Sequence, residues 1–212
     1  MKYVHLKSNL QKIHRLWQAF QAYSLIIVAD ALLRAGSSVH PYNLVSGNFI
    51  IKTYPRGFYS SGRYSFFEIT WQNERYSLFS VLNIRQRFGY TFNLDIALVN
   101  DEPPARDPYD HTDVLFFGEC KRGNGYSELL ATYEGLFYFI FGRKSEYLRR
   151  RTGRNVYSTL ILSGDSFNTL RDAHNYYTRH NLPLSIYDNI RPYTIETNRL
   201  MLNLAKEFKR IL

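Results

Sequence analysis

Residues 113–122 read Asp-Val-Leu-Phe-Phe-Gly-Glu-Cys-Lys-Arg, an apolar run that ends in a carboxylate and an ammonium group two positions apart. Side chains alternate between the two faces of a β-strand, so Glu119 and Lys121 share one face while Cys120 lies on the other. Charges at the end of a buried strand are costly unless they are paired or bind a metal. This stretch therefore predicts a buried strand that positions a functional pair of charges.

Apolar periodicity and turn residues on both sides of this strand predict a mixed β-sheet flanked by helices. Antiparallel strands are expected at 65–71, 75–82, 91–99 and 113–121. A crossover helix at 126–150 and a further strand at 156–162 should follow them. The core of this α/β (α+β) domain would then span about residues 64–163.

Helical segments are expected on either side of this core. Ser8 with Gln11 forms a capping-box signature and Gly36 is a natural stop, so an N-terminal helix is predicted at about 8–35. A C-terminal extension, about 166–212, should hold a helix to His180, an extended stretch at 184–190 and a last helix at 194–212. Residues 36–63 are rich in Gly, Ser, Pro and Tyr, with a short strand at 48–53. No domain boundary is evident, so residues 1–212 are expected to form a single domain.

The tripeptide Glu-x-Lys is not specific by itself, because the chain holds a second copy, Glu207-Phe208-Lys209. That copy falls in the predicted last helix, where residues two apart do not face one another, and it is expected to be surface charge. The first copy differs because it ends an apolar strand and is followed by a basic, Gly-rich turn and a helix.

An earlier strand carries a single acidic residue, Asp95. Strict alternation places it opposite the apolar face of that strand, which consists of Phe92, Leu94, Ile96 and Leu98. If the strands at 91–99 and 113–121 are neighbours, Asp95 can approach Glu119 and Lys121. Glu68, on the strand at 65–71, either joins this group or pairs with an Arg on a neighbouring strand.

This arrangement resembles the PD-(D/E)xK nuclease superfamily, whose restriction-endonuclease-like core is a helix, three antiparallel strands, a helix and a strand. The resemblance covers residues 65–162, and the opening helix fits the first helix of the family. It implies that Asp95 is the first acid, Glu119 the second and Lys121 the lysine of the motif. It further implies an endonuclease that hydrolyses phosphodiester bonds, in DNA rather than RNA, and that acts as a homodimer.

A Mg²⁺ or Mn²⁺ cofactor also follows from the resemblance. Such ions prefer oxygen ligands, which Asp95, Glu119 and the backbone carbonyl of Cys120 would supply. Lys121 would orient or deprotonate the attacking water, or stabilise charge in the transition state. The chain departs from the family pattern at Leu94, where the name-giving proline would stand, and in its opening helix, whose one acidic residue is Asp30 rather than a supplementary Glu.

The charge balance favours a polyanionic partner. The chain has 27 Lys and Arg against 18 Asp and Glu, a net charge of +9. Arg122 adjoins the predicted site, and a basic run further along offers further phosphate contacts, although it equally fits a solvated helix end. That run consists of Lys144, Arg149, Arg150, Arg151 and Arg154.

Other features limit the alternatives. The single cysteine, Cys120, excludes a disulfide within the chain and fits a reducing compartment, and no Cys/His cluster has zinc spacing. The longest aliphatic stretch, residues 25–28, is far shorter than a bilayer-spanning helix, so a cytoplasmic protein with no membrane partner is expected. A catalytically inactive nucleic-acid-binding module of the same fold and a protein-interaction scaffold remain as alternatives.

Overall fold

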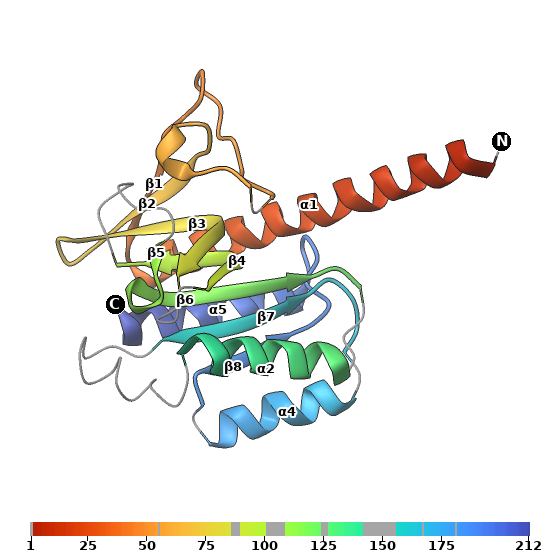
Figure 1. Ribbon diagram of the computed structural model, residues 1–212. Coiled ribbons are helices and arrows are strands. Elements are labelled where there is room, and N and C mark those ends of the chain that lie inside the picture. The colour runs from red at the N-terminus through yellow and green to blue at the C-terminus, as the bar shows by residue number, and fades with distance from the viewer. Residues whose placement is uncertain are drawn as a thin grey trace.

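The protein has a mixed α/β architecture in which helices cover both faces of one mixed β-sheet (Figure 1). This computed structural model describes residues 2–54, 56–85, 90–100, 109–123, 127–141, 156–166, 168–180 and 182–212. The helices are α1 (Lys2–Ala35), α2 (Ser127–Phe141), α4 (Asn168–Arg179) and α5 (Ile195–Ile211), with short 3-10 turns η1 (Tyr59–Ser61) and η2 (His111–Asp113). The strands are β1 (Ser38–Tyr42), β2 (Phe66–Trp71), β3 (Glu74–Arg85), β4 (Thr91–Val99), β5 (Tyr109–Asp110), β6 (Val114–Lys121), β7 (Tyr157–Leu162) and β8 (Leu184–Tyr187).

The strand order across the sheet is β1-β2-β3-β4-β6-β7-β8, and β5 pairs with the end of β3. Neighbouring strands are antiparallel from β1 to β6, whereas β6, β7 and β8 run parallel. Gln72 and Asn73 both have positive φ and form the tight turn between β2 and β3. The four predicted antiparallel strands and the parallel strand that follows α2 are therefore confirmed.

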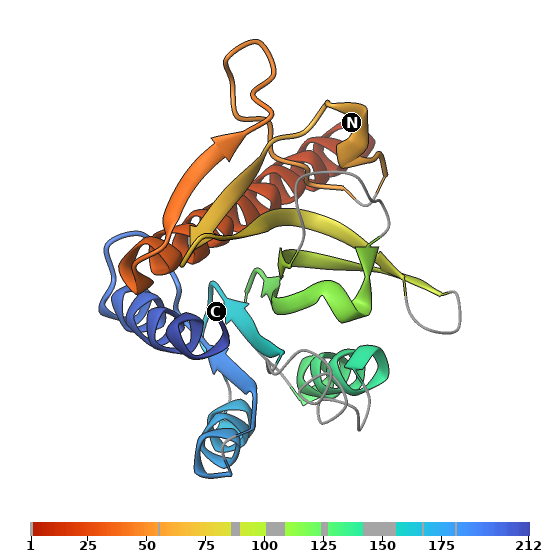
Figure 2. The ribbon, with the colours of Figure 1, turned by 90° about the vertical axis from the view of Figure 1, so that its left-hand side faces the viewer.

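Each face of the sheet has its own buried apolar cluster. The first cluster joins the sheet to α1 and α5 and includes Val28, Leu32, Ile96, Phe116 and Phe208. The second joins the sheet to α2 and α4 and includes Phe79, Leu94, Phe117, Tyr133 and Leu170. Figure 2 shows α1 with α5 on one side of the sheet and α2 with α4 on the other. Strands buried on both faces explain why β6 reads as a continuous apolar run rather than an alternating one.

The opening helix begins at Lys2, not at Ser8 as the capping-box signature predicted. No Gly or Pro occurs before Gly36, so nothing in the preceding residues stops the helix. Ser8 and Gln11 therefore lie inside α1, and its N-terminal part projects beyond the sheet (Figure 1). The predicted stop is confirmed, because α1 ends at Ala35 and Gly36 follows with a φ of 107°.

Residues 15–35 of α1 are also long and apolar enough to cross a membrane, with a mean hydropathy of 1.4. Half of this stretch is buried inside the fold. Core helices of soluble proteins and N-terminal signal sequences meet the same criterion, so the stretch is weak evidence for a membrane.

The segment between α1 and β2 differs from its prediction. Its strand is β1 at Ser38–Tyr42, which pairs with β2, and not residues 48–53. Proline is tolerated at position 41 because β1 is an edge strand, and no further strand pairs with its outer side. Residues 48–53 instead bond to a loop: the Ile50 amide donates to Ser65 Oγ, and the Ser65 amide donates to the Ile50 carbonyl.

Smaller corrections apply to the C-terminal half. Helix α4 begins at Asn168 rather than at Ser166, because the Ser166 amide and hydroxyl both donate to the Asp188 carboxylate. The extended stretch ends at Tyr187 rather than at residue 190. The crossover helix is described to Phe141, and the rest of its predicted length lies outside the described residues.

The alternation of side chains breaks at one point in both central strands. Leu94 packs in the cluster with α2, whereas Ile96 and Leu98 pack in the cluster with α1, so the prediction that all three share one face is wrong.

The cause lies in the pairing of β3 with β4. Ser80 pairs with Ile96 and Leu82 pairs with Leu94, but between them Val81 has a φ of 49° and Asp95 forms no ladder pair with it. A left-handed φ is a genuine outlier for a β-branched residue, and such strain clusters at functional sites.

This strain gives the first prediction, for Val81→Gly. Glycine adopts a φ of 49° without steric cost, so relief of about 1–3 kcal/mol should offset part of the lost apolar burial. Val99→Gly is the matched control, because Val99 is equally buried on β4 but has no positive φ. Urea unfolding measures the free energy of unfolding of each variant. The loss should be smaller for Val81→Gly than for Val99→Gly, by at least about 1 kcal/mol. Equal losses would show that Val81 is not strained.

Candidate active site

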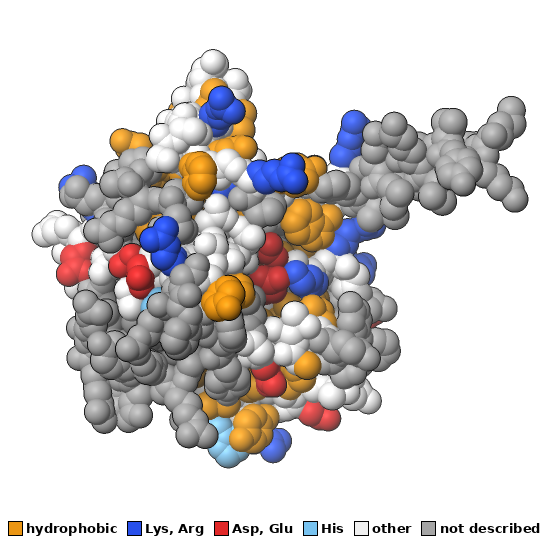
Figure 3. Space-filling view, viewed as in Figure 1, with side chains coloured by type: hydrophobic (Ala, Val, Ile, Leu, Met, Phe, Trp, Pro, Cys, Tyr) orange, Lys and Arg blue, Asp and Glu red, His pale blue; other side chains and the backbone are white. Residues whose placement is uncertain are grey.

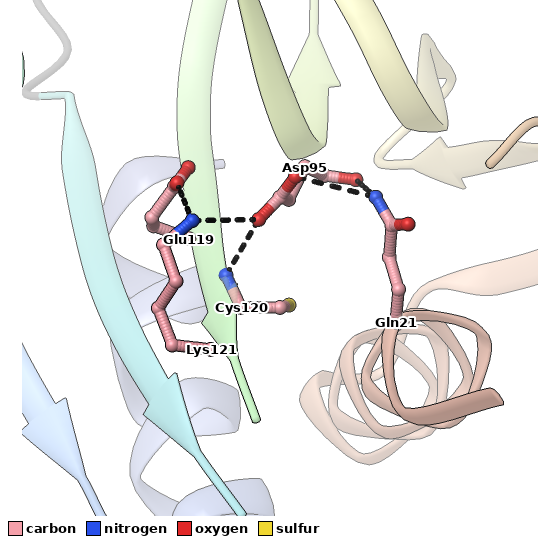
Figure 4. A network of polar contacts seen from close by, with 5 residues as sticks. All are labelled: Gln21, Asp95, Glu119, Cys120 and Lys121. Carbon is pink, nitrogen blue, oxygen red and sulfur yellow. Dashed lines mark hydrogen bonds and ion pairs between the residues drawn. The ribbon is translucent and has the colours of Figure 1, made fainter. Parts of the chain in front are cut away.

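The sheet opens between β4 and β6, and the predicted site lies at this opening. Ladder pairing between these strands ends where Ile96 faces Gly118. Two residues further along β6, the Cys120 amide donates a hydrogen bond of 2.9 Å to Asp95 Oδ2 instead of to a backbone carbonyl of β4 (Figure 4). The carboxylate of Asp95 thus takes the place of a ladder acceptor and is fixed against the C-terminal end of β6.

Lys121 joins the two predicted acids. Its Nζ lies 2.5 Å from Glu119 Oε1 and 3.8 Å from Asp95 Oδ2, so a single ammonium group contacts both carboxylates (Figure 4). The side chains of Asp95 and Glu119 are each 15% exposed and that of Lys121 is 36% exposed. The structure therefore brings Asp95, Glu119 and Lys121 together, and leaves them accessible from one side. The Cys120 side chain is buried on the opposite face, as the alternation predicted.

Gln21 is a fourth member of the site that sequence reasoning missed. It extends from α1, is fully buried, and its Nε2 donates at 3.3 Å to both Asp95 Oδ1 and the Asp95 carbonyl (Figure 4). Its Oε1 is buried without a hydrogen-bond partner among the described residues. Gln21 lies at helical spacing from the buried Leu25 and Val28, and a long polar side chain at such a position was the available signal.

Burial dominates the electrostatics of the site. Desolvation, and to a lesser degree the neighbouring charge of Asp95, raise the pKa of Glu119 to about 7 against the opposing effect of Lys121. Desolvation likewise raises the pKa of Asp95, against the opposing effects of Lys121 and the Cys120 amide. Burial alone would lower the pKa of Lys121, but the Glu119 and Asp95 carboxylates together raise it. Lys121 is thus held in its charged form, while two carboxylates share one nearby cation.

The donor set suits a hard divalent cation. Asp95, Glu119 and the Cys120 carbonyl offer oxygens, whereas the buried Gln21 Oε1 points away from Asp95 (Figure 4). A bound cation would neutralise the second carboxylate, which Lys121 alone does not. Among the described residues no group of three or more His, Cys, Asp and Glu could hold a metal, so the protein carboxylates at this site number two. One or two carboxylates with waters and substrate phosphate is a typical Mg²⁺ environment.

Two arginines flank the end of β6. Arg122 follows Lys121 directly and is exposed, and its predicted role as a phosphate contact stays a prediction. Arg191 was not predicted: its Nε donates to the Ser163 carbonyl, and the Ser163 amide donates to the Lys121 carbonyl. The basic run predicted further along, Lys144, Arg149, Arg150, Arg151 and Arg154, lies outside the described residues.

Three other features lie away from the site. Glu68 is on β2, and β3 separates β2 from β4, so Glu68 does not join Asp95. The second copy of the tripeptide lies on α5, where Glu207 pairs with Arg210 at 3.1 Å and Lys209 is exposed, as predicted for surface charge. A cavity of about 590 Å³ lies between α4, β8 and α5, and none of the three site residues lines it.

No model of a protein family matches the chain, and no curated protein matches it.

The electrostatics predict a shifted titration. In the folded protein with a chelator present, Glu119 should titrate with a midpoint of about 7 rather than 4.5. Because its folded pKa lies above its unfolded value, this group lowers the free energy of unfolding as pH rises from about 4.5 to 7. Carbon-13 NMR of labelled Glu carboxyl groups measures the midpoint, and Glu119→Gln identifies the resonance. A midpoint near 4.5 would show that the site is more solvated than described.

Proposed function

We propose that this protein is a metal-dependent endonuclease of the PD-(D/E)xK superfamily, which hydrolyses phosphodiester bonds in DNA. The observation that carries the proposal is the convergence of Asp95, Glu119 and Lys121 at the opening between β4 and β6. These residues come from two strands, and the two acids are 24 positions apart in the sequence. The alternation of β6 keeps the Cys120 side chain, but not its backbone, out of the site. A lysine that contacts two buried carboxylates is an expensive arrangement to keep for stability alone.

The order of elements supports the same proposal at the level of the fold. Reading α1, β3, β4, β6, α2 and β7 in turn gives a helix, three antiparallel strands, a helix and a strand parallel to β6. A restriction-endonuclease-like core has this order, with its acids on the second and third strands, as Asp95 and Glu119 are here. Fold analogy supports the assignment only together with the site, because one fold hosts many activities.

Mg²⁺ or Mn²⁺ would be held by Asp95, Glu119 and the Cys120 carbonyl, and when bound it would activate water and neutralise charge on the phosphate. Gln21 fixes Asp95 through Oδ1, while the Cys120 amide fixes it through Oδ2. These two bonds hold the carboxylate in one orientation and leave its remaining lone pairs available to a cation.

Lys121 acts as a fixed positive charge in this proposal. Its raised pKa keeps the ammonium protonated, which suits stabilisation of the negative charge that builds on the phosphate better than removal of a proton from water. Hydrolysis joins a water oxygen to phosphorus and breaks one ester P–O bond, and the leaving oxygen gains a proton. Arg122 and Arg191, beside the end of β6, would hold the phosphates that flank the bond.

The proposal extends to the partner and its context. A net charge of +9 favours nucleic acid, the homodimer follows from the resemblance alone, and the cytoplasmic location rests on the single cysteine, which fits a reducing compartment. A non-cleaving module that uses the same surface for binding is the second candidate, because Leu94 stands where the proline of the family pattern would be and the opening helix offers no supplementary Glu.

Cleavage tests the proposal directly. Plasmid and single-stranded DNA should be cut with Mg²⁺ or Mn²⁺ and not with a chelator. Asp95→Asn, Glu119→Gln and Lys121→Met should each lower the rate by at least about a hundredfold, because each removes a ligand or a charge at the reacting phosphate. Gel assays of initial rates measure this loss.

The second copy of the tripeptide provides the control for that experiment. Glu207→Gln and Lys209→Met change the same residue types on α5 and should leave the rate unchanged. Salt-sensitive DNA binding without cutting by the wild-type protein would favour the binding module instead. Absence of both cutting and binding would favour a protein-interaction scaffold.

Metal binding should depend on pH. Mg²⁺ should raise the thermal unfolding midpoint, and its apparent affinity should weaken by up to about tenfold for each pH unit below 7, because protons compete for Glu119. Glu119→Gln and Asp95→Asn should abolish the shift, whereas Glu207→Gln should retain it. Thermal unfolding across a Mg²⁺ series at several pH values measures the effect, and a pH-independent affinity would contradict Glu119 as a ligand.

A further inference from the structure

A lobe that carries no acid projects above the sheet beside the site. It consists of residues 38–54 and 56–64, which include β1 and η1, and it rises beyond the ends of β2 and β3 (Figure 1). In the sequence no Asp or Glu occurs between Asp30 and Glu68, while Lys52, Arg56 and Arg63 fall within the lobe. Arg56 and Arg63 are both exposed. The lobe therefore presents positive charge without an internal counter-charge.

Aromatic rings of the lobe fall into two groups. Tyr59 is buried and packs against Phe66 and Phe79, with ring centroids 6.2 and 4.5 Å away, so it belongs to the core. Phe58 and Tyr54 instead expose 51% and 49% of their surface. These two residues stand on either side of the exposed Arg56 in the sequence, so two exposed rings flank one exposed cation along the chain. Figure 3 shows hydrophobic and basic side chains interspersed over the projecting part of this face.

The lobe is tied to the elements that hold the site. Gln18 Nε2 donates to Thr53 Oγ1 at 3.0 Å, one helical turn before Gln21, which bonds Asp95. On the other side, Ser80 Oγ donates to the Lys52 carbonyl at 2.7 Å, and Tyr59 Oη donates to the Ser80 carbonyl. Ser80 directly precedes the strained Val81 opposite Asp95. The chain from Thr53 to Phe58 thus begins next to the residues that position the first acid.

We propose that this lobe binds unpaired bases of a single-stranded segment of the DNA substrate, with Tyr54 and Phe58 as stacking platforms and Arg56 and Arg63 on the adjoining phosphates. This inference rests on the proposed function for the scissile bond and adds the class of substrate. Bases within a duplex already stack on their neighbours, whereas unpaired bases offer both faces to protein rings. Cations that only track a duplex backbone would need no exposed rings beside them.

Binding separates this proposal from cleavage. Fluorescence anisotropy with a labelled oligothymidine strand and with the matching duplex measures affinity for each, using the Glu119→Gln protein with a chelator so that nothing is cut. The single strand should bind more tightly than the duplex at equal salt. Tyr54→Ala with Phe58→Ala should weaken single-strand binding by at least about tenfold and duplex binding by less than about threefold.

Further variants distinguish stacking from charge. Phe58→Leu keeps an apolar side chain but loses the aromatic face, and should lower single-strand affinity while the thermal unfolding midpoint stays unchanged. Arg56→Ala with Arg63→Ala should weaken binding of both the single strand and the duplex. It should also reduce the slope of log affinity against log salt by about 1–2. Tyr176→Ala is the control, because Tyr176 is 55% exposed on α4, across the sheet from the lobe.

The outcomes keep the two proposals apart. Cleavage of duplex and single strand at equal rates, with no effect of Tyr54→Ala and Phe58→Ala, would overturn the lobe assignment and leave the nuclease in place. Lobe-dependent binding of the single strand by a protein that never cuts would overturn the nuclease and support the lobe. If Tyr176→Ala weakens single-strand binding as much as Tyr54→Ala with Phe58→Ala, any exposed aromatic side chain contributes to binding. That result would overturn the lobe assignment as well.

Discussion

A single hydrogen bond, from the Cys120 amide to Asp95 Oδ2, decides how the centre of this protein is built. A β-sheet normally satisfies each inner amide with a carbonyl of the neighbouring strand. Here the ladder between β4 and β6 ends at the pair Ile96–Gly118, and a side-chain carboxylate accepts from the Cys120 amide, which would otherwise be orphaned. The opening therefore costs no unsatisfied backbone donor at Cys120, and the acid that closes it is at the same time fixed beside Glu119 and Lys121.

The strain in β3 lies on the other edge of β4 from this opening. There Val81 takes a left-handed φ, and the faces of both strands exchange. Gln21 then supports Asp95 from α1, so three elements that are distant in sequence meet on one carboxylate. Residues held by several partners can keep a conformation that would relax in isolation, and this is the circumstance in which strain persists at functional sites.

The sequence predicted most of the elements and the proximity of Asp95, Glu119 and Lys121, because these depend on local patterns. The apolar run before Glu119, the alternation within β6 and the turn at Gln72-Asn73 are short-range features that tertiary packing reinforced. Asp95 was placed correctly by an argument that was partly wrong, since strict alternation fails at Asp95 itself and Leu94 packs on the other face. Gln21 had only a weak local signal and Arg191 had none, because their contacts form only when α1 packs against β4 and the segment before α5 packs beside β6. Periodicity likewise pointed to residues 48–53 and missed the edge strand at 38–42, whose place is decided by its pairing with β2.

The two copies of Glu-x-Lys show what turns a tripeptide into a site. Glu207 and Lys209 lie on a helix, where residues two apart diverge, and the half-buried Glu207 pairs one turn away with Arg210, which is exposed. In that setting the charges are screened and an ion pair contributes little. Glu119 and Lys121 lie on a strand, where residues two apart point the same way, and a second carboxylate converges on them as water is withdrawn. Desolvation then raises the pKa of both acids and makes a further cation favourable there. The chemistry of the site is thus set less by the three residue types than by the strand geometry and the burial that surround them.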